Sequence, residues 1–219
     1  MTIILDMPNL TTSTSIYREY YPTLTDGCWL KYFGGSYATQ IPSEPFLTQI
    51  NSFEINIKFI ADIVNDGSTY WCLLGQKTQN RGCPQIEIES GYIKLITSES
   101  TGAWTGAIRA PINAKTIYTL NCSWDNINNK IVGTVTDEQG VVTHLEPYAS
   151  YTDSTTKIVW QDYAVLGSDQ GSTYFNGKIN LEDSYIKING ELWWEGLTEV
   201  DVSPIFSQQY EAIGGTTQI

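Results

Sequence analysis

The chain has 219 residues, of which 41% are apolar and 12% aromatic, and this composition excludes a wholly disordered protein because it can bury a substantial core. Its formal net charge of −12 argues against docking on nucleic acid or on an anionic membrane face, since either would repel it. Four cysteines without a C-x-x-C pair and a single histidine, His144, assemble no zinc or redox motif, so no metal or other cofactor is expected.

Two terminal segments, residues 1–25 and 197–219, lack regular alternation but carry large apolar side chains. These side chains have no clear place in a closed sheet structure and therefore need partners. We predict that both segments are arms that pack on neighbouring subunits, and that the chain is a homo-oligomer, with a trimer as the expected assembly.

The first ten residues show no secretory signal pattern, and no stretch approaches the roughly 18 apolar residues of a membrane span. We therefore expect assembly in a cytoplasm with reduced cysteines and no membrane insertion.

One short helical turn is predicted, at residues 43–50. Ser43 is a residue type that caps helices, Glu44 suits the positive end of a helix, and Pro45 suits a first turn.

Alternating apolar and polar residues predict strands at 54–60, 85–89 and 92–97. In the second of these strands Glu87 and Glu89 share the face opposite Ile86 and Ile88. The two later segments are separated by one short turn and are expected to be consecutive antiparallel strands.

The remainder of the chain has the pattern of strands and turns. Residues 116–145 contain three extended runs separated by Asp125–Asn129 and Asp137–Gly140, which predicts a three-stranded meander. Extended runs follow at 156–160, 163–167 and 174–194, and Asn189-Gly190 is placed as a hairpin turn within the last.

Many strands without alternating helices favour a single all-β domain: an antiparallel sandwich of two sheets. Its core is predicted to contain the alternating residues Ile55, Ile57, Phe59, Ile179, Ile186 and Ile188.

Two segments carry a family resemblance. The first contains Phe33, Tyr37, Ala38, Ile41 and Pro42, and leads into the strand at 54–60. The second contains the matching residues Phe175, Gly177, Ile179, Leu181, Tyr185, Ile186, Asn189 and Gly190. Leu74-Gly75 and Leu166-Gly167 also match short Leu-Gly strands. Together they resemble the laminin G-like, concanavalin A-like jelly-roll domains of tailed-bacteriophage virion proteins, which implies a jelly-roll domain at 26–196.

The resemblance implies a structural or adhesive virion protein, such as a tail fibre, baseplate or other surface-displayed component. The expected partners are other virion proteins and a host-surface glycan, and the expected location is the virion, assembled in the host cytoplasm. The alternative is a capsid decoration or fibre-anchoring protein with a purely structural role.

A glycan hydrolase is the third interpretation, because hydrolases on this fold use clustered carboxylates on one strand. Glu87 and Glu89 share a strand face, but the position expected for a third acidic residue is Gly91. We therefore expect a solvated outer face and no catalytic residue. His144 lacks a nearby nucleophile pattern and is expected at the surface.

Candidate glycan-binding residues are the aromatic side chains Trp104, Tyr148 and Tyr151, which lie in loop-like contexts. Flat rings pack against the CH faces of sugars, but burial in the core or at a subunit interface is the alternative for Trp104, Trp193 and Trp194. Asp62, Asn65 and Asp66 offer oxygens of the kind that calcium binds, but a polar hairpin loop has the same composition, so no metal site is assigned.

Overall fold

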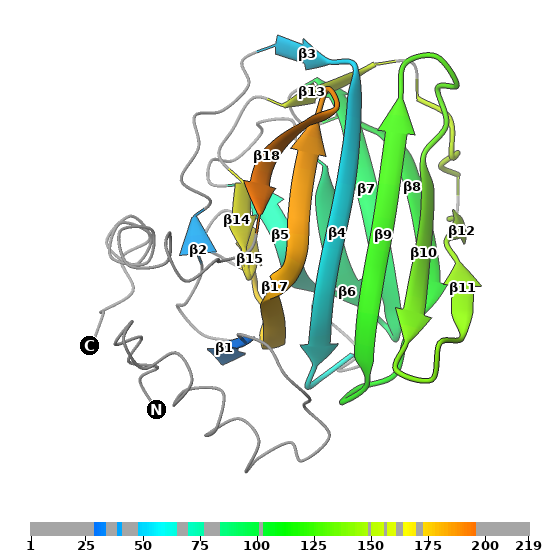
Figure 1. The fold of residues 1–219 in the computed structure, drawn as a ribbon. Helices are drawn as coiled ribbons and strands as arrows, with labels where there is room; N and C mark the ends of the chain where they lie inside the picture. The colour runs from blue at the N-terminus through cyan, green and yellow to red at the C-terminus, as the bar shows by residue number, and fades with distance from the viewer. Residues whose placement is uncertain are drawn as a thin grey trace.

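The computed structural model describes residues 29–33, 39–40, 48–64, 70–76, 84–100, 103–148, 150–155, 157–160, 164–169 and 173–195. Every regular element in this part of the chain is a β-strand, and the strands form two antiparallel seven-stranded sheets that face each other (Figure 1). The predicted arms at 1–25 and 197–219 lie outside the described residues.

Sheet A follows the order β1–β17–β4–β9–β10–β11, and β18 also pairs with β17. Its strands are β1 (Trp29–Phe33), β4 (Ser52–Ala61), β9 (Ile117–Asp125), β10 (Val132–Asp137), β11 (Val142–His144), β17 (Asn176–Ile188) and β18 (Glu191–Glu195).

Sheet B follows the order β12–β8–β7–β6–β5–β14–β2. Its strands are β2 (Thr39–Gln40), β5 (Trp71–Gln76), β6 (Gln85–Glu89), β7 (Tyr92–Ser100), β8 (Ala103–Pro111), β12 (Glu146–Pro147) and β14 (Ala164–Leu166). The two Leu-Gly segments meet here, because Leu166 of β14 lies opposite Leu74 of β5 and Val165 lies opposite Gly75.

Two short pairs complete the fold. β3 (Thr48–Ile50) pairs with β13 (Ile158–Trp160), and β15 (Ser168–Asp169) pairs with β16 (Thr173–Tyr174). The first pair corrects the predicted helical turn at 43–50: residues 48–50 form a strand, and residues 43–47 lie outside the described part. Pairing with a segment more than a hundred residues away overrides the local helix signals.

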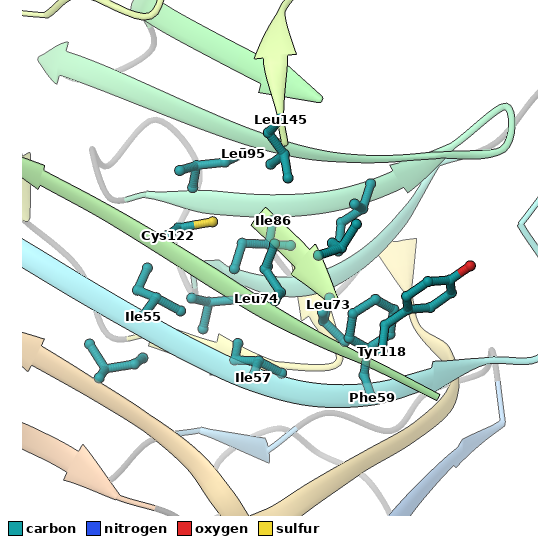
Figure 2. Close-up of a cluster of buried hydrophobic side chains, with 14 of the residues drawn as sticks. Ile55, Ile57, Phe59, Leu73, Leu74, Ile86, Leu95, Tyr118, Cys122 and Leu145 are labelled. Atoms are coloured by element: carbon teal, nitrogen blue, oxygen red, sulfur yellow. The ribbon is translucent and has the colours of Figure 1, made fainter. Parts of the chain in front are cut away.

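The core lies between the two sheets, and it confirms the predicted alternation. Ile55, Ile57 and Phe59 of β4 are fully buried, and the intervening polar residues are half-buried on the outer face. All six core residues that the sequence indicated are buried in one cluster. Figure 2 shows side chains of β4 and β9, including Cys122, near Leu74, Ile86 and Leu95 of sheet B. Each large aliphatic side chain buried in this way stabilises the fold by about 1.5 to 3 kcal/mol.

Aspartate side chains close the turns of the predicted meander, which the structure confirms as β9–β10–β11. The Asp125 carboxylate accepts hydrogen bonds from the backbone N–H groups of Ile127 and Asn128, at 2.9 and 2.7 Å. These bonds favour the ionised carboxylate and hold the pKa of Asp125 below its ordinary value. The Asp137 carboxylate accepts hydrogen bonds from the backbone N–H groups of Gln139 and Val141, at 3.0 and 2.9 Å.

Candidate functional site

Three adjacent strands of sheet B present polar and aromatic residues on the face that points away from the core. Ile86, Ile88, Ile93, Leu95 and Ile108 of β6, β7 and β8 point into the core, so the residues between them point outward. The pairing register places Glu87 opposite Lys94, Lys94 opposite Arg109, and Arg109 opposite Glu146. One row of four charged residues, with a carboxylate at each end and two cations between them, therefore crosses four strands.

Arg109 lies between two tyrosine rings. Its guanidinium carbon is 4.1 Å from the ring centroid of Tyr92 and 4.5 Å from that of Tyr148. The Tyr148 ring in turn stacks against Tyr151, with centroids 6.4 Å apart and planes inclined by 29°. We call these four residues the tyrosine–arginine cluster; all four side chains are half-buried and reach solvent in part.

The edge of β8 fixes the position of the two tyrosines from the later segment. The backbone N–H of Tyr148 donates to the carbonyl of Ala107 at 3.1 Å, and the N–H of Ala107 donates to the carbonyl of Thr152 at 3.2 Å. The N–H of Tyr151 donates to the carbonyl of Tyr148 and closes a turn between them. These bonds thus place the Tyr148 ring beside Arg109 of β8 and the Tyr151 ring against Tyr148.

Lys94 lies opposite Arg109 on β7 and is almost completely buried. Its ammonium group is 4.6 Å from the Tyr148 ring centroid and forms an ion pair with Glu89. Burial lowers the pKa of Lys94, Arg109 lowers it further by repulsion, and the Glu87 carboxylate partly offsets both effects. The charge of Lys94 is therefore matched by carboxylates of β6.

Glu87 differs from the expectation of a solvated outer face. Its side chain shares that face with Glu89, as predicted, but only 4% of the residue is exposed. The Gln85 side-chain amide donates a hydrogen bond of 2.9 Å to its carboxylate. Packing on the outer side of the sheet covers this position, which alternation alone does not reveal.

Arg109 has no carboxylate partner of its own among the described residues. The ion pairs there join lysines to Asp62, Glu54, Glu89, Asp153 and Asp183. Glu146 lies across from Arg109 in the register, but its side chain is exposed and forms no ion pair with it. Both rings lie close to the guanidinium carbon, and the N–H groups of the guanidinium radiate in its plane.

Of the three predicted binding residues, Tyr148 and Tyr151 are brought together. Trp104 does not lie in a loop as expected but in β8, with its backbone opposite Ser98; its side chain lies outside the described part of the structure. Sequence reasoning missed Tyr92, Lys94 and Arg109. The alternation of residues 92–97 placed Tyr92 and Lys94 on a polar face, but the register that joins them to Arg109 and Tyr148 leaves no pattern in the sequence.

None of the other residues that the sequence singled out belongs to the tyrosine–arginine cluster. Trp194 is buried in the core, and Trp193 packs against it, as the alternative interpretation expected. His144 is exposed at the end of β11 in sheet A. Asp62 lies 3.9 Å from the ammonium of buried Lys178, and residues 65 and 66 are outside the described ranges. Within those ranges no three acidic, histidine or cysteine side chains gather in a way that could hold a metal, and no helix is long and apolar enough to span a membrane.

Comparison with known proteins identifies the fold. No protein-family model matches the sequence, and no curated protein does. Among solved structures, domains LG4-5 of the mouse laminin alpha1 chain superpose with a TM-score of 0.50 at 15% identity, over 78% of this chain and 45% of the laminin chain. This chain thus spans less than half of that structure.

Two further structures are similar at lower scores. The binding domain of botulinum neurotoxin serotype G gives a TM-score of 0.48 at 11% identity, over 84% of this chain and 46% of the toxin chain. The CBM40 of the Ruminococcus gnavus IT-sialidase, solved with α2,3 sialyllactose, gives 0.46 at 14% identity, over 80% and 99%. With its two antiparallel sheets and its likeness to the laminin domains, the chain has the laminin G-like jelly-roll sandwich fold.

Proposed function

We propose that this chain is a glycan-binding adhesive domain and that the tyrosine–arginine cluster is its binding site. The observation that carries the proposal is the position of Arg109 between the rings of Tyr92 and Tyr148, on the outer face of a sheet. Part of each ring reaches solvent, so a sugar can pack its CH face on it. The guanidinium N–H groups and tyrosine hydroxyls then supply the directional hydrogen bonds that sugar hydroxyls require.

The binding test compares two tyrosines in similar surroundings on opposite sheets. Tyr148 lies 4.6 Å from the Lys94 ammonium, and Tyr185 on the outer face of sheet A lies 4.8 Å from that of Lys187. We expect Tyr148→Ala to weaken binding to glycans identified on an array about tenfold or more, because it removes the central ring. Tyr185→Ala should bind normally. Equal affinities of both variants and wild type, all folded by circular dichroism, would place the site elsewhere.

We propose further that the domain acts without catalysis. Glu87 is buried and bonded to Gln85, and Glu89 is paired with Lys94, so neither carboxylate stands free beside the tyrosine rings. We expect no release of reducing sugar from any glycan that the protein binds. Release that disappears in a Glu87→Gln variant would contradict this.

The biological setting that we propose is the surface of a tailed-phage particle, with the chain as a homo-oligomeric, trimeric fibre or baseplate component that contacts other virion proteins. Its support is the resemblance of the segments around Phe33 and from Phe175 to Gly190. Antibody labelling of intact particles tests the location, and light scattering of the full chain tests the assembly. Label on the head together with absence of glycan binding would favour the decoration protein instead.

A further inference from the structure

We infer that the tyrosine–arginine cluster selects sugars that carry a carboxylate, and that the Arg109 guanidinium binds this carboxylate in a bidentate manner. The inference rests on the proposed function and specifies the ligand class for the same site. Three features support it: the contacts of Arg109 with two tyrosine rings, the charges around it and the shape of the anion.

The rings of Tyr92 and Tyr148 hold the guanidinium in place before any ligand arrives. At 4.1 and 4.5 Å from the guanidinium carbon, both ring centroids are within the range of a cation–π contact. A fixed guanidinium loses little conformational entropy when its two parallel N–H groups engage an anion. The free rim of the group is therefore prepared for a planar acceptor with two oxygens.

Near the cluster, Arg109 is a cation that no carboxylate of the described residues pairs with. Lys94 is paired with Glu89 and attracted by Glu87, whereas no carboxylate in the described residues pairs with Arg109. A half-buried guanidinium gains most from a partner that the ligand supplies.

The surroundings favour a singly charged sugar over a polyanion. Glu87, Glu89 and Glu146 lie on neighbouring strands, and the net charge of the chain is −12, so each additional negative charge on a ligand is repelled. A carboxylate matches the two parallel N–H groups of the guanidinium, and the sugar ring that carries it packs on Tyr148 and Tyr151. Sulfated polymers carry too much charge for this site.

The experiment measures binding of the full chain to matched oligosaccharides by calorimetry. The probes end in a uronic or sialic acid and are compared with their carboxyl methyl esters, with neutral parents and with sulfated analogues. We expect the acids to bind about tenfold more tightly than their esters, and Arg109→Lys to abolish this difference because lysine keeps the charge but lacks the planar fork. Thermal unfolding checks that each variant is folded.

A second variant is expected to increase the affinity for acidic sugars instead of lowering it. Glu146→Gln removes the carboxylate opposite Arg109, so we expect it to tighten binding of the acids about threefold and to leave the neutral parents unchanged. Glu191→Gln is the matched control, because it makes the same change in net charge on an exposed position of β18 in sheet A.

The outcomes separate the two proposals. Equal affinity for acids and esters, with binding still lost in Tyr148→Ala, would overturn the carboxylate inference and leave glycan binding intact. Preferential binding of the sulfated analogues would also overturn it. Absence of binding to every probe and to a broad neutral array would overturn the proposed function itself.

Discussion

Gly177 of β17 shows how a single residue without a side chain permits the central pairing of sheet A. A Cβ atom at this position would lie 2.1 Å from the carbonyl oxygen of Ile60 and 2.5 Å from the ring of Phe175. The backbone of β4 supplies the first of these atoms and cannot move without disturbing the sheet. Gly177 is therefore a site where the backbones of β17 and β4 approach closely.

We expect Gly177→Ala to lower the free energy of unfolding by about 3 kcal/mol, because overpacking forces the strands apart. Gly140→Ala is the control: Gly140 has a φ of 81°, but a Cβ atom added to it would meet no atom within 4 Å, so only backbone strain of about 1 kcal/mol applies. Urea denaturation measures both. Equal losses would show that the contact with Ile60 does not limit the fold.

Glu54, Tyr185 and Lys187 form a polar group on the outer face of sheet A. The Tyr185 hydroxyl donates to the Glu54 carboxylate, and the Lys187 ammonium lies 3.3 Å from both carboxylate oxygens. The bond from Tyr185 lowers the pKa of Glu54, with Lys187 acting in the same direction and burial opposing both. The same bond raises the pKa of Tyr185 to about 12.

These shifts predict a coupling that depends on pH. The depressed pKa of Glu54 stabilises the fold above the ordinary value of 4.5, and this contribution is lost as the pH falls through the folded-state pKa. The raised pKa of Tyr185 stabilises the fold below 10.0, and this contribution is lost as the pH rises towards about 12. A double-mutant cycle with Glu54→Gln and Tyr185→Phe should give its largest coupling energy near neutral pH. A coupling that is constant from acid to alkaline pH would refute the assignment.

At the scale of elements, the hairpin between β17 and β18 also anchors the start of β4. Asn189 and Gly190 have φ values of 55° and 81°, as the predicted Asn-Gly turn requires. The Asn189 side-chain oxygen accepts hydrogen bonds from the backbone N–H groups of Asn51 and Ser52, at 2.7 and 3.3 Å. Asn189 thus links the β17–β18 turn to the start of β4.

Comparing two asparagines with the same backbone conformation separates the effect of the left-handed backbone from that of the side-chain hydrogen bonds. Asn189→Ala should cost about 2 kcal/mol, because it combines the strain of a left-handed alanine with loss of two accepted bonds. Asn129 also has a φ of 55°, but in the described structure its side chain accepts no such bonds, so Asn129→Ala should cost about 1 kcal/mol. Denaturation midpoints compare them, and equal costs would mean that the Asn189 side chain adds nothing.

The hairpins of the sandwich were predictable because their signals are local. Alternation marked β4, β6 and β7, and turn residues marked the connections of β9, β10 and β11. The tyrosine–arginine cluster was predictable only in part, since Tyr148 reaches Arg109 through pairing of β12 with β8 rather than through nearby sequence. The same limit explains the wrong helical turn, because Thr48–Ile50 pair with β13.

For the whole molecule, Cys122 reports on the separation of the two sheets. It lies on β9 in the core cluster, and a Cβ at Gly133 would be 3.2 Å from its sulfur. Burial strongly raises the pKa of its thiol, which suppresses the reactive thiolate.

We expect Cys122 to resist iodoacetamide in the native protein and to react at the rate of unfolding once denaturant is added, as followed by peptide mapping. Identifying the labelled peptide distinguishes this thiol from the other cysteines. Labelling of the Cys122 peptide at the rate of an exposed thiol without denaturant would show that the sheets separate more readily than the close packing implies.

β1 and β18 both lie along the same side of β17, since β4 occupies its other side throughout. Both run antiparallel to β17. Trp29 lies opposite Asn180 and Glu195 lies opposite Tyr185, so β1 and β18 pair with successive parts of β17 along the same edge. The described chain therefore enters and leaves the sandwich at neighbouring points of one edge. Because these two points are close together, a domain built in this way can be inserted into a surface loop of another protein without separating the two ends of that loop.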